Sequence, residues 1–368
     1  MLILLILCGA VSAIACAILL RIGRTNGRRY GQSVPQRFHA GHVPRLGGVA
    51  MMVACTAGWC WIVGAERFLA IPNQIRLPIG MAAAWWAVAI IAVAGGVAED
   101  LTHRLTAAWR LLFTVVAGAV ATALLNLSIP SLGLNWTQSL WAASAWPGIA
   151  LAIFAVAGLP HAFNLIDGYN GLAGIVAMIC CFALAYVSLL AGDRQLAGVM
   201  MVLAGSTAGF LVWNYPRGLI FAGDGGAYLW GVVIAVASVQ LVQRYPAVSP
   251  WFPVLLLIYP VWETLFSIYR KLSRGQSPGV ADALHFHQLI YRRIVRGVFD
   301  DDEARRMLMR NNRTSPYLWG FTVLTVIPAV LFWRNTPVLI FFTALFVVSY
   351  VWAYVSIVRF KVPRWLRR

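Results

Sequence analysis

Residues 79–98 read IGMAAAWWAVAIIAVAGGVA, an uninterrupted apolar run that is followed at once by Glu99 and Asp100. About 20 apolar residues are what an α-helix needs to cross the hydrocarbon core of a bilayer. The two carboxylates therefore lie where this predicted span meets the membrane surface. Charge is costly at that position unless it is paired or functional.

Runs of the same kind recur along the 368 residues, 61% of which are hydrophobic and 11% charged. We expect an all-α polytopic integral membrane protein, with one membrane-embedded domain over residues 1–368 and a cytoplasmic loop at about 270–315. The eleven expected spans cover roughly residues 2–20, 46–64, 79–98, 107–126, 147–163, 172–191, 195–213, 226–243, 251–269, 317–333 and 337–358.

The formal net charge of +17 is concentrated on one side of these spans. If residues 21–45 are cytoplasmic, that side holds 24 of the 29 Lys and Arg residues. Because basic residues gather in cytoplasmic loops, we expect the N-terminus outside and the C-terminus inside. The same asymmetry explains the basic composition, so we expect the lipid bilayer as a partner and no nucleic acid.

Four acidic clusters then fall on the cytoplasmic side: Glu99-Asp100, Asp167, Asp224 and Asp282. The first closes a helix at its C-terminus, where the macrodipole disfavours negative charge, so we expect a compensating cation. Asp224 lies in Gly-Asp-Gly-Gly just before a span and could simply cap that helix. Its neighbouring glycines would equally let a phosphate or metal approach the backbone.

Three further segments carry polar groups at this side. Residues 164–171, NLIDGYNG, form a turn rich in Asx and Gly residues between two spans. Residues 44–48, PRLGG, open a span whose first backbone N–H groups could receive an anion. His285 and His287 would act together only if the segment does not start as a helix. The stripe of Phe286, Ile290 and Ile294 indicates a short helix on the membrane surface.

Acidic side chains beside basic ones suit a hard divalent cation. Mg²⁺, with Mn²⁺ as the alternative, is typically shared between carboxylates and substrate phosphates. Neighbouring Arg and His residues can stabilise charge on a phosphoryl group. A site of this kind at the lipid boundary implies one soluble phosphorylated substrate and one acceptor embedded in the membrane.

In order along the chain, these motifs resemble the polyprenyl-phosphate N-acetylhexosamine-1-phosphate transferases, bacterial membrane enzymes that begin lipid-linked glycan synthesis. The resemblance covers nearly the whole length. It rests on HVPRLGG at 42–48, ED at 99–100, NLIDGYNGLA at 164–173, GDGG at 223–226 and DALHFHQ at 282–288.

The resemblance implies transfer of a sugar-1-phosphate from a UDP-N-acetylhexosamine to undecaprenyl phosphate at the cytoplasmic face of the bacterial inner membrane, with UMP as the second product. It also implies roles for individual residues. Asp224 and Asp100 would bind the metal. The implied catalytic residues are Asp100, Glu99, His285 and His287, and the implied substrate-binding residues are Arg45, Gly47, Gly48, Asn164, Asp167, Asn170, Arg270 and Arg274.

Three positions depart from the family pattern: Glu99 and Asn170 replace Asp, and Gln288 replaces a third His. These departures favour a sub-branch that serves O-antigen or a related envelope polysaccharide. Two alternatives stay open, a secondary transporter and a catalytically inactive scaffold. A transporter would carry ionisable groups near mid-membrane, whereas the acid inside an expected span is Glu263, which we expect to pair with Arg270. The oligomeric state is also open, a homodimer included.

Overall fold

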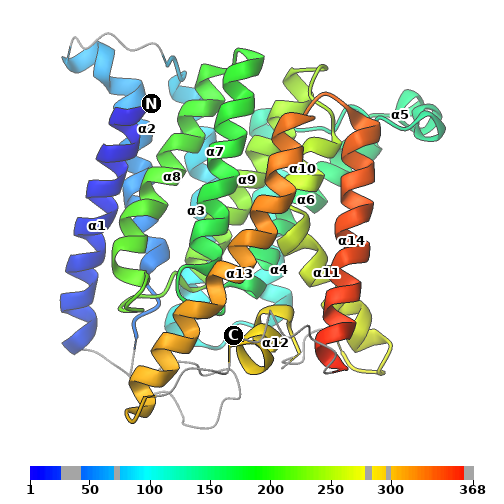
Figure 1. The fold of residues 1–368 in the computed structure, drawn as a ribbon. Helices are drawn as coiled ribbons and strands as arrows, with labels where there is room; N and C mark the ends of the chain where they lie inside the picture. Colours follow the sequence, from blue (N-terminus) through cyan, green and yellow to red (C-terminus); the bar gives the residue numbers. More distant parts are fainter. Residues whose placement is uncertain (26–42, 70–74, 278–283, 296–299, 360–368) are drawn as a thin grey trace.

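The computed structural model describes residues 1–25, 43–69, 75–277, 284–295 and 300–359 (Figure 1). Within these ranges the chain forms helices and no strand. Ten of the helices are long and apolar enough to cross a membrane, so the all-α, multi-pass architecture expected from the sequence is confirmed. They are α1 (Leu2–Thr25), α2 (Gly47–Leu69), α3 (Ile79–Thr102), α4 (Ala107–Leu125), α6 (Trp146–Ile166), α7 (Leu172–Ala191), α8 (Arg194–Asn214), α9 (Gly223–Arg244), α13 (Glu303–Leu331) and α14 (Thr336–Val358).

The ninth expected span, at 251–269, is divided into two helices. These are α10 (Trp251–Leu256) and α11 (Ile258–Leu272), and the backbone leaves helical geometry at Leu257. Pro260 has no N–H to donate to the carbonyl of residue 256, and its ring crowds that carbonyl, so an unbroken helix is disfavoured here. The break turns α11 into a separate element that ends among the site residues described below.

Helix α9 lies at the centre of the bundle. Its membrane-length stretch is entirely buried within the protein, whereas only 22%, 22% and 28% of the corresponding stretches of α1, α4 and α14 are buried. A helix that is apolar on all sides is expected to be enclosed by others, and α9 packs against α2, α3 and α6. This central position brings the start of α9 into contact with the ends of several neighbours.

One end of the bundle, at the bottom of Figure 1, collects the end of α11, the short helix α12 (Phe286–Arg293) and the start of α13. The expected loop at 270–315 is therefore partly helical. Helix α13 begins at Glu303, well before the span predicted at 317–333, because the Asp302 side chain accepts the backbone N–H groups of Ala304 and Arg305 and caps the helix.

Helix α12 differs from the membrane-surface helix predicted from its apolar stripe. All residues from Phe286 to Tyr291 are buried, including His287 and Gln288, and the helix packs against α13 and α14. The stripe was a correct sign of a helix. Its polar side also faces protein, however, because His287 packs against Tyr169. At the opposite end, η1 (Asn135–Thr137) and α5 (Gln138–Ala143) connect α4 to α6.

Candidate active site

The end of α3 meets the start of α9 through Asp100. Its Oδ1 accepts the backbone N–H of Asp224 and its Oδ2 that of Gly225, each at 3.0 Å. Free N–H groups and the positive end of the macrodipole stabilise a carboxylate at a helix N-terminus. The compensation that the sequence led us to expect from a cation is thus supplied, for Asp100, by backbone N–H groups of α9.

Close approach of these two helices depends on glycine. A Cβ at Gly96 of α3 would lie 2.4 Å from the backbone nitrogen of Gly225. Gly223 has a φ of +70°, and a Cβ there would collide with the Asp100 carboxylate. The glycines around Asp224 therefore serve helix contact and chain direction.

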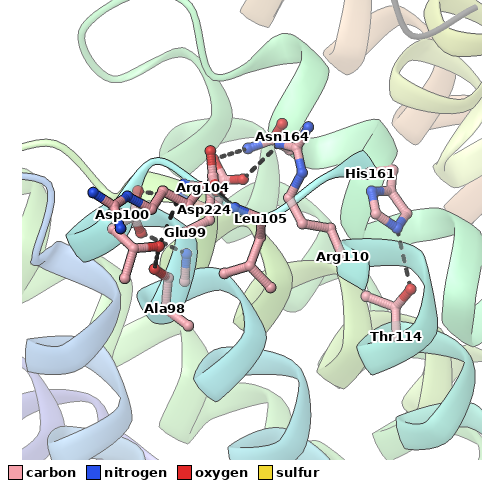
Figure 2. Close-up of polar contacts among 12 residues, drawn as sticks. Ala98, Glu99, Asp100, Arg104, Leu105, Arg110, Thr114, His161, Asn164 and Asp224 are labelled. Atoms are coloured by element: carbon pink, nitrogen blue, oxygen red, sulfur yellow. Dashed lines mark hydrogen bonds and ion pairs between the residues drawn. The ribbon is translucent and has the colours of Figure 1, made fainter. Parts of the chain in front are cut away.

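The Asp224 side chain is held by two other helices (Figure 2). Asn164 of α6 donates its Nδ2–H to Oδ1 at 2.8 Å, and Arg110 of α4 donates to Oδ2 from Nη1 at 3.0 Å. Asp224 lies in the first turn of α9 and makes no cap hydrogen bond. The alternative that Asp224 simply caps its helix is therefore not realised.

Arg110 is a site residue that sequence reasoning missed. It was counted only as one of the basic residues that set topology, yet its guanidinium forms the ion pair with Asp224. The available signal was its place in the first turn of the span that follows Glu99 and Asp100. His161 of α6 lies close by and shares a hydrogen bond with Thr114 of α4 at 3.1 Å (Figure 2).

Asp167 follows α6 directly and lies close to the Arg45 guanidinium and to Asp224. Burial raises the pKa of the Asp167 carboxyl from its ordinary 3.8 to about 7; Arg45 opposes this increase and the negative charge of Asp224 adds to it. The structure thus brings Asp100, Asp167 and Asp224 together from three separate parts of the chain.

Gly47 and Gly48 do not offer free N–H groups to an anion. Their N–H groups donate to the carbonyls of Phe221 and Ala222, both at 2.9 Å. The expectation of an anion site at this helix start is therefore wrong in its physical basis. Arg45, two residues before Gly47, is exposed.

Glu99 completes the turn between α3 and α4. Its Oε2 accepts the backbone N–H of Leu105 at 2.8 Å, while its neighbour Asp100 faces α9. The two adjacent acids therefore point to different partners. Glu99 supports the position of α4, which carries Arg110.

Asn170 has a structural role. It is 1% exposed; its backbone N–H donates to Asn311 of α13 at 2.8 Å, and its Nδ2 donates to Asn312 at 3.1 Å and to the carbonyl of Pro216 at 3.3 Å. Ser315 donates to the Asn170 carbonyl at 2.7 Å. These bonds fix the turn against α13 and leave Asn170 poorly placed for the substrate role that the resemblance implies.

His285 and His287 can act together only if their segment does not begin as a helix, and the structure meets this condition. His285 precedes α12 in an extended conformation, with ψ at 149°. Their rings stack at 5.3 Å between centroids and 12° between planes. His287 also lies against the turn at residues 164–171, because a Cβ on Gly168 would lie 3.1 Å from the Nε2 atom of His287. The histidine pair is therefore next to Asp167.

Arg270, in the last turn of α11, and Arg274, just after this helix, have different surroundings. Arg270 is buried and donates to the Tyr354 hydroxyl of α14 at 2.8 Å, with its guanidinium over the ring of Phe266. Arg274 is exposed. Glu263 contacts α12 and α14 instead of forming the predicted pair with Arg270. Three residues of the sequence motifs, His42, Asp282 and Ala283, lie outside the described residues.

The carboxylates of this site are the candidate ligands for a divalent cation. No group of three or more His, Cys, Asp and Glu side chains in the described ranges is arranged to hold a metal ion. Mg²⁺ commonly takes only one or two carboxylates and completes its shell with water and substrate phosphates. Asp224 and Asp167 fit that requirement, since they are carboxylates whose mutual charge repulsion a cation would relieve.

Comparison with known proteins matches residues 82–242 to the family described as Glycosyl transferase family 4. The matched region runs from α3 to α9 and contains Asp100, Arg110, Asn164, Asp167 and Asp224. This region of the chain is similar to the family 4 glycosyl transferases. The resemblance inferred from its motifs is thereby confirmed.

Individual proteins align over most of this chain. A probable undecaprenyl-phosphate N-acetylglucosaminyl 1-phosphate transferase of Bacillus subtilis (strain 168) is 26% identical over 284 residues, which cover 75% of this chain and 72% of that protein. A decaprenyl-phosphate N-acetylglucosaminephosphotransferase of Mycobacterium leprae is 26% identical over 340 residues, 80% of each chain. The undecaprenyl-phosphate alpha-N-acetylglucosaminyl 1-phosphate transferase of Escherichia coli (strain K12) is 26% identical over 260 residues, covering 69% and 66%.

Proposed function

We propose that this protein transfers an N-acetylhexosamine 1-phosphate from its UDP-linked form to undecaprenyl phosphate, releasing UMP. The observation that carries the proposal is the gathering of Asp100, Asp167 and Asp224 with Arg45 and Arg110 at one end of a membrane bundle. The names of the aligned relatives support polyprenyl phosphate as acceptor and make N-acetylglucosamine the first sugar to test.

In this proposal each acid has a different task. Asp224 and Asp167 would hold Mg²⁺ or Mn²⁺, and the bound ion would neutralise charge on the donor diphosphate. Asp100 keeps Asp224 in place by accepting its backbone N–H. Asn164 and Arg110 orient the Asp224 carboxylate from two sides.

The basic residues would bind the phosphates. Arg45 is exposed beside Asp167, and Arg110 can pair with a phosphate oxygen when the metal occupies Asp224. His285 and His287, adjacent to the same turn, would donate to the diphosphate of the sugar nucleotide. An oxygen of the lipid phosphate would then attack the β-phosphorus, and UMP would leave with the α-phosphate.

The charge asymmetry of the chain supports a location in the bacterial inner membrane with this end at the cytoplasmic face. Initiation of O-antigen or a related envelope polysaccharide is the pathway class we propose. Because the site is assembled from one chain, each subunit of a homodimer would carry a complete site.

The test is UMP release by purified protein in proteoliposomes containing undecaprenyl phosphate, with Mg²⁺ and a panel of UDP-sugars. We expect activity that EDTA abolishes and that Asp224→Asn removes. Asp193→Asn is the matched control, because this buried carboxylate forms its ion pair with Arg244 at the opposite end of the bundle. Absence of UMP release with every donor would contradict the proposal, and solute uptake by the same vesicles would favour a transporter.

A further inference from the structure

Glu263 is the most deeply buried carboxylate of the described residues, with 0% of its surface exposed. It lies in α11, the second half of the broken helix, where an ionised group is expensive unless several donors surround it. Two donors do so, the Tyr350 hydroxyl of α14 and the backbone N–H of Phe286 in α12, and the imidazole of His285, just before α12, lies 3.4 Å away. This number of partners for one side chain marks Glu263 as the point where three separate elements meet.

The backbone contact explains where α12 begins. Glu263 Oε1 accepts the N–H of Phe286, the first residue of the helix, at 2.9 Å. The first N–H groups of a helix have no partner within it, and no side chain of α12 itself caps this end. A carboxylate from another helix therefore supplies the cap, with a favourable interaction between its charge and the helix dipole.

The start of α12 in turn decides the geometry of the histidines. His285 stays extended because the helix begins one residue later, and residues two apart then project to the same side. The two imidazole rings stack, and His287 lies against the turn at Gly168. The same Oε1 lies 3.4 Å from His285 Nδ1, so the carboxylate also favours one orientation of that ring.

A second contact anchors the carboxylate itself. Tyr350 of α14 donates its hydroxyl to Glu263 Oε2. Tyr350 is 0% exposed, and its ring packs against Phe286 at 4.9 Å between centroids. The C-terminal helix therefore contributes to the position of the histidines although it carries none of the predicted site residues.

We propose that Glu263 is the positioning residue of the His285–His287 pair: its carboxylate fixes the start of α12 and so places both rings beside the Asp167 turn. The inference rests on the proposed function only for its kinetic consequence. Its structural consequence is measurable on the protein without any substrate.

The first measurement is amide hydrogen exchange of the detergent-solubilised protein. Glu263→Ala removes the acceptor, so we expect exchange over residues 286–290 to become at least about tenfold faster, as for loss of a buried charge-assisted hydrogen bond. Glu263→Gln keeps one carbonyl oxygen for Phe286 and should restore most of the protection. Asp193→Ala, which removes another buried carboxylate that caps a helix, should leave residues 286–290 unchanged.

The second measurement is kcat and KM for the UDP-sugar. We expect kcat/KM to fall at least about tenfold in Glu263→Ala, the scale on which carboxylates that orient functional histidines act, with partial rescue in Glu263→Gln. Asp193→Ala should reduce thermal stability without this loss per folded molecule. Unchanged exchange in Glu263→Ala, or equal effects of Glu263→Ala and Asp193→Ala, would overturn the inference. An inactive wild-type protein would contradict the proposed function and leave the exchange result valid.

Discussion

The Asp100 carboxylate accepts the backbone N–H of Asp224 at 3.0 Å, so the last turn of α3 holds the first turn of α9. This contact joins two acids that are far apart in sequence and assigns them different tasks. Asp100 faces backbone donors, whereas the Asp224 side chain faces Asn164 and Arg110. Four helices thereby meet at one carboxylate pair.

The contact between α3 and α9 requires Gly96. In Gly96→Ala the new methyl group would overlap the backbone of Gly225, so we expect destabilisation of about 1–3 kcal/mol and loss of most activity. Thermal unfolding in detergent and UMP release measure the two effects. Gly80→Ala in the same helix is the control, since its methyl group meets nothing within 4 Å. Equal stability of the two variants would contradict the packing argument.

Arg110 should be needed for turnover more than for stability. Its ion pair with Asp224 is partly exposed, and such pairs contribute little to folding. We expect Arg110→Met to lower kcat/KM at least about tenfold and Arg110→Lys to retain part of the activity, because a single charge-assisted hydrogen bond contributes about 1.5–3 kcal/mol.

The control for Arg110 is Arg104→Met, which changes the same residue type at an exposed position between α3 and α4. It should have nearly wild-type kinetics. A comparable loss in both variants would mean that overall positive charge, and not the contact with Asp224, is what the reaction needs.

The raised pKa of Asp167 predicts that stability depends on pH in the absence of metal. Because burial raises its pKa from 3.8 to about 7, the neutral carboxyl favours folding at low pH, and this contribution is lost as the pH rises through about 7. With EDTA present, the thermal midpoint should fall between pH 5 and pH 8 by more in the wild type than in Asp167→Asn.

A divalent cation should reverse this trend. A cation competes with the proton for the carboxylate, so Mg²⁺ should raise the thermal midpoint more at pH 8 than at pH 5.5. Asp167→Asn should show little difference between the two pH values. The same Mg²⁺ effect at both pH values in the wild type would remove Asp167 from the metal site.

Asn170 should tolerate no charge. In Asn170→Asp the donor to Asn312 and to the Pro216 carbonyl is lost, and a carboxylate faces two oxygen atoms. We expect destabilisation of about 1–3 kcal/mol, measured by thermal unfolding, because buried groups lose their partners. Asn335→Asp makes the same chemical change at the exposed N-cap of α14, where either side chain can accept the backbone N–H of Val338, and should be nearly neutral. If Asn170→Asp were instead as stable as the wild type and more active, the substrate role implied by the resemblance would be restored.

The sequence alone determined the membrane architecture and the end of the bundle at which the acids lie. Long apolar runs must be helical in a bilayer, because every backbone N–H and carbonyl needs a partner within its own segment. Acids such as Asp100 and Asp224 are found at the ends of those runs, since charge within them is costly. These are local constraints, and each can be recognised from one stretch of sequence.

Tertiary structure decided which of these groups meet and what each one does. Arg110 was indistinguishable from a topology signal until α4 was placed beside α9, and Asn170 could be assigned to structure only when α13 was seen to cover it. Glu263 reaches Phe286 because Pro260 breaks the expected span and the chain returns beside α14. Such contacts depend on how separate helices pack, and no single stretch of sequence contains that information.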